Sequence, residues 1–203
     1  NMATLVLNKH IEEKLRAEAL HNEQRQHDEV WNGVTVIMPD ANLEHTVLAG
    51  FFCHVFLSIF GATRGTCHPG CNISDRIEGW KDNYRIPDFC YYAPANPAQN
   101  CGTHWCGGPD FLVEILSPGD QGRDKLEFYA GVGVQEVLII DREPWVLELY
   151  RRRRNRLVLV GTCPPNGAAL ESRVVPLSFQ LVAGTIRPSL VFQQLPNGQA
   201  WTW

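Results

Sequence analysis

The sequence predicts an α/β (α+β) fold with a mixed central sheet, flanking helices and added β-hairpins. Two apolar strand-like runs, residues 110–116 and 136–140, are separated by one helical segment, residues 121–130. A helix crossover between neighbouring strands makes those strands parallel. Turn residues at Asn32-Gly33 and across 153–156 each separate two β-like runs, which is the pattern of antiparallel hairpins. We therefore expect both parallel and antiparallel pairs in the sheet.

The first sixty residues predict a helix, a hairpin and a second helix. Residues 9–25 are highly charged with a thin apolar stripe, which is typical of a solvated helix. Residues 29–38 form the first predicted hairpin. Residues 43–60 are apolar around most of a helix circumference and predict a helix packed deep against the sheet. Their apolar part is shorter than the ~20 residues of a membrane span, so no membrane helix is expected.

The middle of the chain predicts two strands before the crossover unit. Residues 65–74 and 84–92 read as strands joined by a polar turn, and a Pro/Gly/Asn-rich loop follows over 93–109. Asp120 is placed to cap the crossover helix, which ends near Gly131 and Gly133.

The last part of the chain predicts a second hairpin and a β-rich tail. Residues 145–152 and 157–160 pair across the turn, and residues 161–203 hold short β-like pieces between Pro and Gly residues. We divide the chain into an N-terminal helical arm (1–27), a core (28–160) and a C-terminal β-rich extension packed on the core (161–203).

Composition and charge narrow the class of protein. The 203 residues are 44% hydrophobic and 20% charged, which is ordinary for a globular domain. The formal charge of −4 argues against a protein that coats nucleic acid by bulk charge, but a local basic groove is compatible with it. Seven cysteines cannot all pair internally, and no apolar secretory segment opens the chain. A reducing, cytoplasmic location is the expectation.

Two acids stand inside apolar strand runs. Asp88 follows Pro87 within residues 84–92, and Glu114 lies within residues 110–116. A carboxylate in such a run is costly unless it is paired or bound to a cation. Two carboxylates on neighbouring strands suit Mg²⁺, which takes one or two protein carboxylates plus waters. Lys125, on the following helix, can point back toward Glu114, and Tyr129 shares its helix face.

Structural roles are the alternative for these residues. An Asp after Pro is common at a turn or a sheet edge, and a buried Glu commonly pairs with an arginine. Arg85 and Arg123 are both placed to serve Glu114 in that way. Lys125 is then a solvated surface lysine.

The ordered motifs resemble one known family. Residues 85–88 (RIPD), 109–118 (PDFLVEILSP), Asp124-Lys125 with Tyr129, and 133–136 (GVQE) are similar to the Uma-two family of restriction-endonuclease-like proteins, in the PD-(D/E)xK nuclease-like superfamily. The likeness runs from about residue 28 to residue 160. The resemblance implies a restriction-endonuclease-like core, Mg²⁺- or Mn²⁺-dependent hydrolysis of DNA phosphodiester bonds, and a homodimer.

The resemblance also implies roles for individual residues. Asp88 and Glu114 are the expected metal-binding acids, and Lys125 is the expected catalytic lysine. The lysine that usually stands two positions after the second acid is replaced here by Leu116, so the resemblance points to a lysine that has moved to the next helix. His45 matches a family histidine and is a further catalytic candidate, with a core or cap role as its alternative; Glu29 is a weaker candidate. A degenerate member that binds nucleic acid or protein without cleaving is the alternative function.

Two cysteine pairs suggest a second metal site. Cys67 and Cys71, with His68 between them, and Cys101 and Cys106, with His104 between them, are separated by three and four residues. Tetrahedral zinc accepts four such ligands, but these spacings are looser than those of zinc knuckles. Zinc is therefore the less favoured cofactor, and scattered thiols in loops are the alternative.

An arginine run completes the candidates. Arg151 to Arg154 with Arg156 place positive charge on the second hairpin. This run is either a contact for the phosphate backbone or a solvated hairpin tip.

Overall fold

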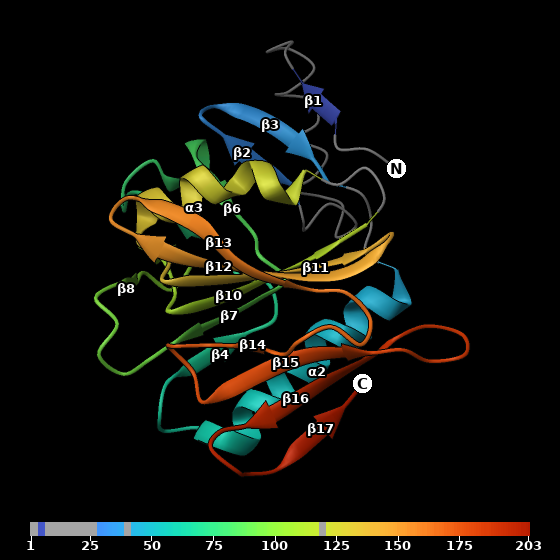
Figure 1. The fold of residues 1–203 in the computed structure, drawn as a ribbon. Helices are drawn as coiled ribbons and strands as arrows, with labels where there is room; N and C mark the ends of the chain where they lie inside the picture. Colours follow the sequence, from blue (N-terminus) through green and yellow to red (C-terminus); the bar gives the residue numbers. More distant parts are fainter. Residues whose placement is uncertain (1–3, 7–27, 39–41, 118–120) are drawn as a thin grey trace.

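The computed structural model describes residues 4–6, 28–38, 42–117 and 121–203 of the chain (Figure 1). Three sheets and two α-helices make up this part. The predicted helix over residues 9–25 and the capping role of Asp120 lie outside the described residues. Residues 4–6 form a strand, β1 (Thr4–Val6), that pairs antiparallel with β3.

The central sheet has six strands in the order β13-β12-β11-β10-β7-β4. Its strands are β4 (Thr66–His68), β7 (Phe89–Tyr92), β10 (Phe111–Leu116), β11 (Glu136–Arg142), β12 (Trp145–Arg153) and β13 (Arg156–Cys163). Strands β10 and β11 run parallel, and the other neighbours in this sheet are antiparallel. The predicted mixed sheet and its parallel pair are confirmed, as is the hairpin β12–β13.

A second sheet has seven strands in the order β1-β3-β2-β6-β5-β9-β8. Its further strands are β2 (Glu29–Trp31), β3 (Val34–Ile37), β5 (Ile73–Ser74), β6 (Tyr84–Arg85), β8 (Gln99–Asn100) and β9 (Trp105–Cys106). The β2–β3 hairpin turns at Asn32 and Gly33, whose φ angles of 50° and 84° suit a tight two-residue turn. This hairpin was predicted and is confirmed.

The predicted strands over 65–74 and 84–92 are each broken in two. Their first and last parts, β4 and β7, pair in the central sheet, while β5 and β6 pair in the second sheet. Pro87 has no amide hydrogen to give to a ladder, which favours a break at that point. Asp88 therefore lies between β6 and β7, and the prediction that placed it inside a continuous strand is wrong.

Helix α2 (Leu43–Phe60) packs between the central sheet and a third, antiparallel sheet near the C-terminus (Figure 1). That third sheet contains β14 (Leu170–Glu171), β15 (Leu177–Val182), β16 (Ser189–Gln194) and β17 (Ala200–Thr202). Phe52 and Phe56 on the helix contact Phe89 of β7, and Phe52 contacts Phe192 of β16 edge-on. The larger of the two hydrophobic cores therefore lies between α2, the central sheet and the third sheet.

By length and composition alone, α2 is also the one helix in the described part that is apolar enough to cross a membrane. Core helices of soluble proteins pass the same test. One face of α2 is fully buried at Leu48, Phe52, Val55 and Phe56, as expected of a helix packed on the sheet. Its other side exposes Leu43, Val47 and Leu57 by 79%, 51% and 49%, so the expected deep burial is limited to one face.

The crossover from β10 to β11 contains a 3₁₀ turn (Gly122–Lys125) followed by α3 (Leu126–Val132). Gly133, with φ 103°, ends α3 in the left-handed conformation that glycine adopts easily. Tyr129 of α3 packs with Leu112, Leu116, Val137 and Ile139 in a second, smaller core on the opposite face of the central sheet. The candidate site lies directly beside this smaller core.

Candidate active site

Glu114 faces α3 because side chains alternate along a strand. Phe111, Val113 and Ile115 of β10 enter the larger core, whereas Leu112 and Leu116 enter the smaller one. Glu114 shares the second face and is only 4% exposed. Lys125 Nζ lies 3.3 Å from each of its carboxylate oxygens, and the Tyr129 hydroxyl donates a short hydrogen bond to Oε1. The prediction that Lys125 points back toward Glu114, with Tyr129 on the same face, is confirmed by this geometry.

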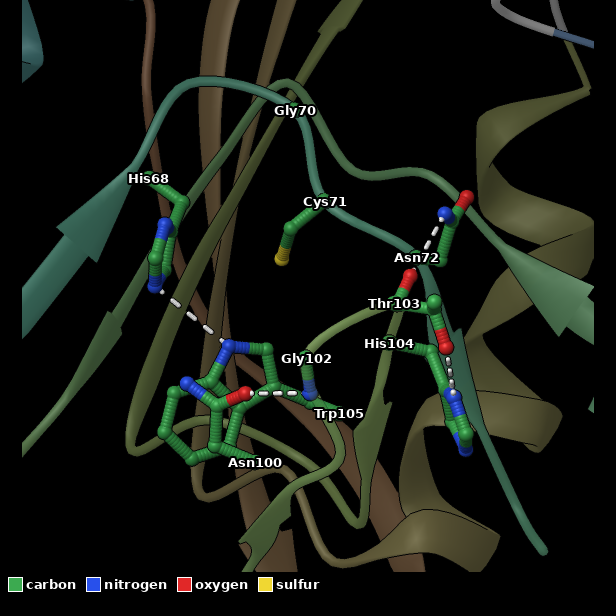
Figure 2. Close-up of a pocket in the computed structure, with 9 residues that line it drawn as sticks. All are labelled: His68, Gly70, Cys71, Asn72, Asn100, Gly102, Thr103, His104 and Trp105. Carbon is green, nitrogen blue, oxygen red and sulfur yellow. Dashed lines mark hydrogen bonds between the residues drawn. The ribbon is translucent and has the colours of Figure 1, made fainter. Parts of the chain in front are cut away.

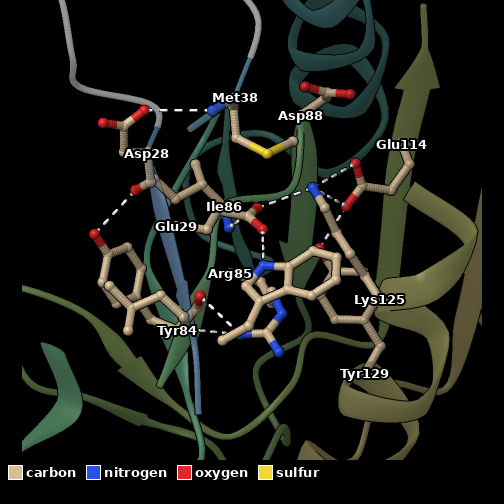
Figure 3. A network of polar contacts seen from close by, with 12 residues as sticks. Asp28, Glu29, Met38, Tyr84, Arg85, Ile86, Asp88, Glu114, Lys125 and Tyr129 are labelled. Atoms are coloured by element: carbon tan, nitrogen blue, oxygen red, sulfur yellow. Dashed lines mark hydrogen bonds and ion pairs between the residues drawn. The ribbon is translucent and has the colours of Figure 1, made fainter. Parts of the chain in front are cut away.

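Glu29 is a second acid on the same ammonium group. Its Oε1 lies 2.9 Å from Lys125 Nζ and accepts a hydrogen bond of 2.8 Å from the Ile86 amide. Its Oε2 accepts a hydrogen bond of 2.7 Å from the indole of Trp31. Figure 3 shows the ammonium between the Glu29 and Glu114 carboxylates. Strand β2 therefore belongs to the site.

Asp88 and His45 form the more accessible end of the site. His45 Nε2 lies 3.1 Å from Asp88 Oδ1, with side chains 15% and 18% exposed. Asp88 Oδ2 accepts a hydrogen bond of 2.6 Å from the amide of Ile115, the residue after Glu114. His45 sits in the first turn of α2, where Asn42 accepts its amide hydrogen bond as the N-cap. Asp88 thus ties the start of α2 to the strand that carries Glu114.

The charges of the site do not balance internally. Burial by itself lowers the pKa of the Lys125 ammonium. The attraction of nearby negative charges, on Glu114, Glu29 and Asp88, is stronger than this effect, so the pKa is raised and the lysine stays cationic. Burial raises the pKa of Glu114 well above its usual range, and the negative charges of Asp88 and Glu29 add to that effect against the attraction of Lys125. One ammonium faces two buried carboxylates, so Glu114 tends to keep a proton. A further positive charge close to Glu114 would favour loss of that proton.

Solvent reaches only one end of this arrangement. Lys125 is 2% exposed and Glu29 is fully buried, so the proposal of a solvated surface lysine is wrong. Asp88 and His45 are partly open. Within the described residues, Glu114 is therefore nearest to solvent on the side of Asp88 and His45.

The two arginines considered as partners of Glu114 serve other groups. Arg123 binds Asp141 and Glu148 at 2.7 and 2.8 Å. Arg85 donates to backbone carbonyls of Val30 and Tyr84, and its guanidinium lies between the rings of Trp31 and Phe128. Neither is bonded to Glu114.

The four cysteines of the zinc hypothesis do not assemble into a site. No group of three or more His, Cys, Asp or Glu side chains within the described ranges has a geometry that holds a metal ion. Cys71 contacts Cys90 instead, and Cys101 donates to the Gln99 carbonyl at 3.7 Å. His104 is occupied by Thr103 and the Arg76 carbonyl. The structure gives zinc no support here.

The arginine run divides into structural and exposed members. Arg151 binds Glu136 at 2.6 Å, and Arg152 donates to the Ala130 carbonyl at the end of α3 at 2.6 Å. Arg153, Arg154 and Arg156 are exposed at the hairpin tip. Since Glu114 aligns with Glu148 through Ile139, Arg153 lies five residues, roughly 17 Å, further along the strands, and the rest of the tip lies beyond it. Only the tip remains available for a phosphate contact.

Glu29 is the site residue that the sequence ranked too low. Its signal was an acid in a short run that alternates with Val30 and leads into the Asn32-Gly33 turn. Alternation places Glu29 and Trp31 on one face, but the sequence does not show that this face covers α3. That contact depends on the pairing of β2 with β6.

A family model and a solved structure are both similar to this chain. The family model Uma2, described as "Putative restriction endonuclease", matches residues 11–184. A crystal structure of "a putative nuclease belonging to DUF820 from Anabaena variabilis ATCC 29413" is similar with a TM-score of 0.58 and 18% identity, covering 77% of this chain and 87% of that one. At this identity the likeness concerns the fold alone. No curated protein matches the chain.

Proposed function

The chain belongs to the Uma2 family, described as "Putative restriction endonuclease", and from this membership we propose that it is a divalent-metal-dependent endonuclease acting on DNA. The observation that supports the proposal is that Lys125 Nζ lies 3.3 Å from both Glu114 oxygens, while Asp88, held by the amide of the next residue, Ile115, adds its negative charge to the surroundings of Glu114. One ammonium faces two buried carboxylates, Glu29 and Glu114, and Asp88 adds a third negative charge near them. Their excess negative charge is a reason to expect a cation.

The two carboxylates suit Mg²⁺ or Mn²⁺ in chemistry, and within the described residues no third His, Cys, Asp or Glu side chain completes a metal-binding group with them. Asp88 and Glu114 offer two carboxylates, which is the usual protein share for Mg²⁺, the remaining positions being waters. They would hold the ion. When bound, it would stabilise charge on a phosphate oxygen and lower the pKa of a coordinated water.

The chain's own residues supply orientation and charge. Lys125 is held as a permanent cation, so it stabilises negative charge and orients Glu114 rather than accepting a proton. Ile115 donates its amide to Asp88, and His45 holds the other Asp88 oxygen, so that carboxylate is fixed on both sides. The Tyr129 hydroxyl fixes Glu114 in the same way.

A second candidate function is DNA binding without cleavage. The observation that favours it is the burial of Lys125, which is 2% exposed and bonded to two carboxylates. Such an amine reaches substrate only after some rearrangement. Homodimerisation and a cytoplasmic location also stay predictions.

The test is cleavage of supercoiled plasmid with Mg²⁺, with Mn²⁺ or with EDTA. The proposal expects nicked or linear DNA with the wild-type protein and a metal, and none with Asp88→Asn or Glu114→Gln. The exposed acid Asp82 gives a control variant, Asp82→Asn, that keeps full activity. Unchanged cleavage by Asp88→Asn, or in EDTA, contradicts the proposal. Retention of labelled duplex without any cleavage by the wild type supports the second candidate.

A further inference from the structure

Two cysteine sulfur atoms lie in contact close to the strand that follows Asp88. Cys71 Sγ is 2.8 Å from Cys90 Sγ. Cys71 lies in the loop between β4 and β5, and Cys90 lies in β7. All seven cysteines are free thiols within the described ranges, and this is the one pair there whose sulfur atoms touch.

The two thiols have different surroundings. Cys90 is fully buried, so solvent and small oxidants do not reach its thiol. Its Sγ also donates to the His68 carbonyl at 3.9 Å, which leaves sulfur lone pairs to face Cys71. Cys71 is the accessible partner.

Cys71 opens on a cavity of about 270 Å³ that His68, Asn72, Asn100 and Trp105 also line. Figure 2 shows the Cys71 sulfur pointing into the space between His68 and Thr103. A small oxidant such as hydrogen peroxide fits this volume easily. It reaches Cys71 first and cannot reach Cys90 without local opening.

Little movement separates this contact from a bond. An S–S bond is about 2.05 Å long, so the sulfur atoms need to approach by less than about 1 Å. Cys71 lies in a short loop next to Gly70. The space beside Gly70 is open, because a Cβ atom placed on this glycine would have only Ile86 Cγ2 within 4 Å, at 3.8 Å. This loop has room to follow the sulfur.

We propose that Cys71 and Cys90 are a redox-active thiol pair that hydrogen peroxide converts into an internal disulfide. Peroxide transfers one oxygen to Cys71, which gives a sulfenic acid and water. The Cys90 sulfur then attacks the Cys71 sulfur; the S–S bond forms, the S–O bond breaks, and the Cys90 proton leaves with the hydroxyl group as a second water. The two thiols lose two electrons and peroxide gains them.

The product ties the β4–β5 loop to β7, two residues beyond Asp88. Gly70 already donates its amide to the Asp88 carbonyl at 3.2 Å, so the bond reinforces an existing contact. Because the link closes a loop in the unfolded chain, the oxidised protein should melt several degrees higher. This inference does not depend on nuclease activity.

The experiment treats the folded protein with peroxide, alkylates it with N-ethylmaleimide after unfolding, and maps the peptides by mass spectrometry. The expected product is two hydrogens lighter, carries a Cys71–Cys90 link, and is alkylated at the other five cysteines. Dithiothreitol restores the starting mass and the lower melting temperature.

Variants separate the two roles. Cys90→Ser should accumulate a sulfenic acid at Cys71, which dimedone traps, and Cys71→Ser should form no link at Cys90. Cys67→Ser, a partly buried cysteine of β4, is the matched control and should form the link normally. If Cys90→Ser does not fold, Cys71→Ser gives the same answer from the accessible side. Peroxide that links other cysteines, or leaves Cys71 alkylatable in the wild type, overturns the proposal.

Discussion

Lys125 lies closer to Glu29 than to Glu114: its Nζ is 2.9 Å from one carboxylate and 3.3 Å from the other. The amine on the crossover turn thus joins two strands from different sheets, β2 and β10. Since all three side chains are buried, Lys125 holds the second sheet against the central one. It also sets the charge that Glu114 experiences.

Removal of this amine should destabilise the fold. Lys125→Met keeps much of the side-chain length but leaves two buried acids without their cation, which typically costs about 3–5 kcal/mol. Urea unfolding monitored by circular dichroism gives the free energy of unfolding. Lys81→Met, at an exposed lysine, should change it by less than about 0.5 kcal/mol. Equal effects of the two variants contradict the buried bridge.

His45 should act through Asp88. It contacts the Asp88 carboxylate from α2, and removing a partner that orients a metal ligand usually costs about 10–100-fold in metal affinity or activity. His45→Ala should therefore raise the Mg²⁺ concentration needed for half-maximal cleavage by that factor. His54→Ala, an exposed histidine on the same helix, should not. A normal Mg²⁺ requirement in His45→Ala assigns His45 a purely structural role.

Arg142 should hold together the two segments that carry His45 and Glu114. Its guanidinium donates to the carbonyl of Leu116, the last residue of β10, at 3.0 Å and to Oγ of the next residue, Ser117, at 2.7 Å. It also donates to Glu44, on the first turn of α2, at 3.0 Å.

Arg142→Leu should lower the free energy of unfolding by about 2 kcal/mol, because the buried Leu116 carbonyl loses its donor, while the half-exposed Glu44 adds little. Chemical denaturation measures the loss. Arg153→Leu at the exposed hairpin tip is the control and should be nearly neutral. A neutral Arg142→Leu rules out the clamp.

The sequence predicted which residues lie together better than it predicted how deeply they are buried. Asp88 and Glu114 were singled out because acids in apolar runs are costly, and Lys125 because it follows on the next helix and can point back toward Glu114. The two hairpins and the parallel pair followed from turn residues and strand order. The burial of Lys125 was left open, because a lysine in the first turns of a helix can be solvated or can point back toward Glu114 until strand β2 is placed beside it.

Long-range pairing explains the other misses. Glu29 reaches Lys125, at the start of α3, only because β2 pairs with β6 across more than fifty residues of chain. The Cys71–Cys90 contact depends on the break at Pro87, which sends β7 into the central sheet beside β4. Local patterns do not encode such registers.

The raised pKa of Glu114 predicts a pH dependence of stability. The folded protein holds a proton that the unfolded chain releases from a carboxyl whose ordinary pKa is 4.5. By linkage, stability then falls as pH rises from about that value through the higher folded pKa. The raised pKa of Lys125 acts in the same sense only at alkaline pH, where its stabilisation is lost.

Glu114→Gln removes the titrating group and should flatten this fall, which urea midpoints at a series of pH values between about 5 and 8 measure directly. A divalent cation favours the ionised carboxylate, so Mg²⁺ should stabilise the wild type more at about pH 8 than at about pH 5 and should release a proton on binding. Asp82→Asn, at an exposed acid, should keep the wild-type slope. If wild type and Glu114→Gln lose stability in parallel, the pKa of Glu114 is not raised in the folded protein, and the argument that it needs a further cation to ionise fails.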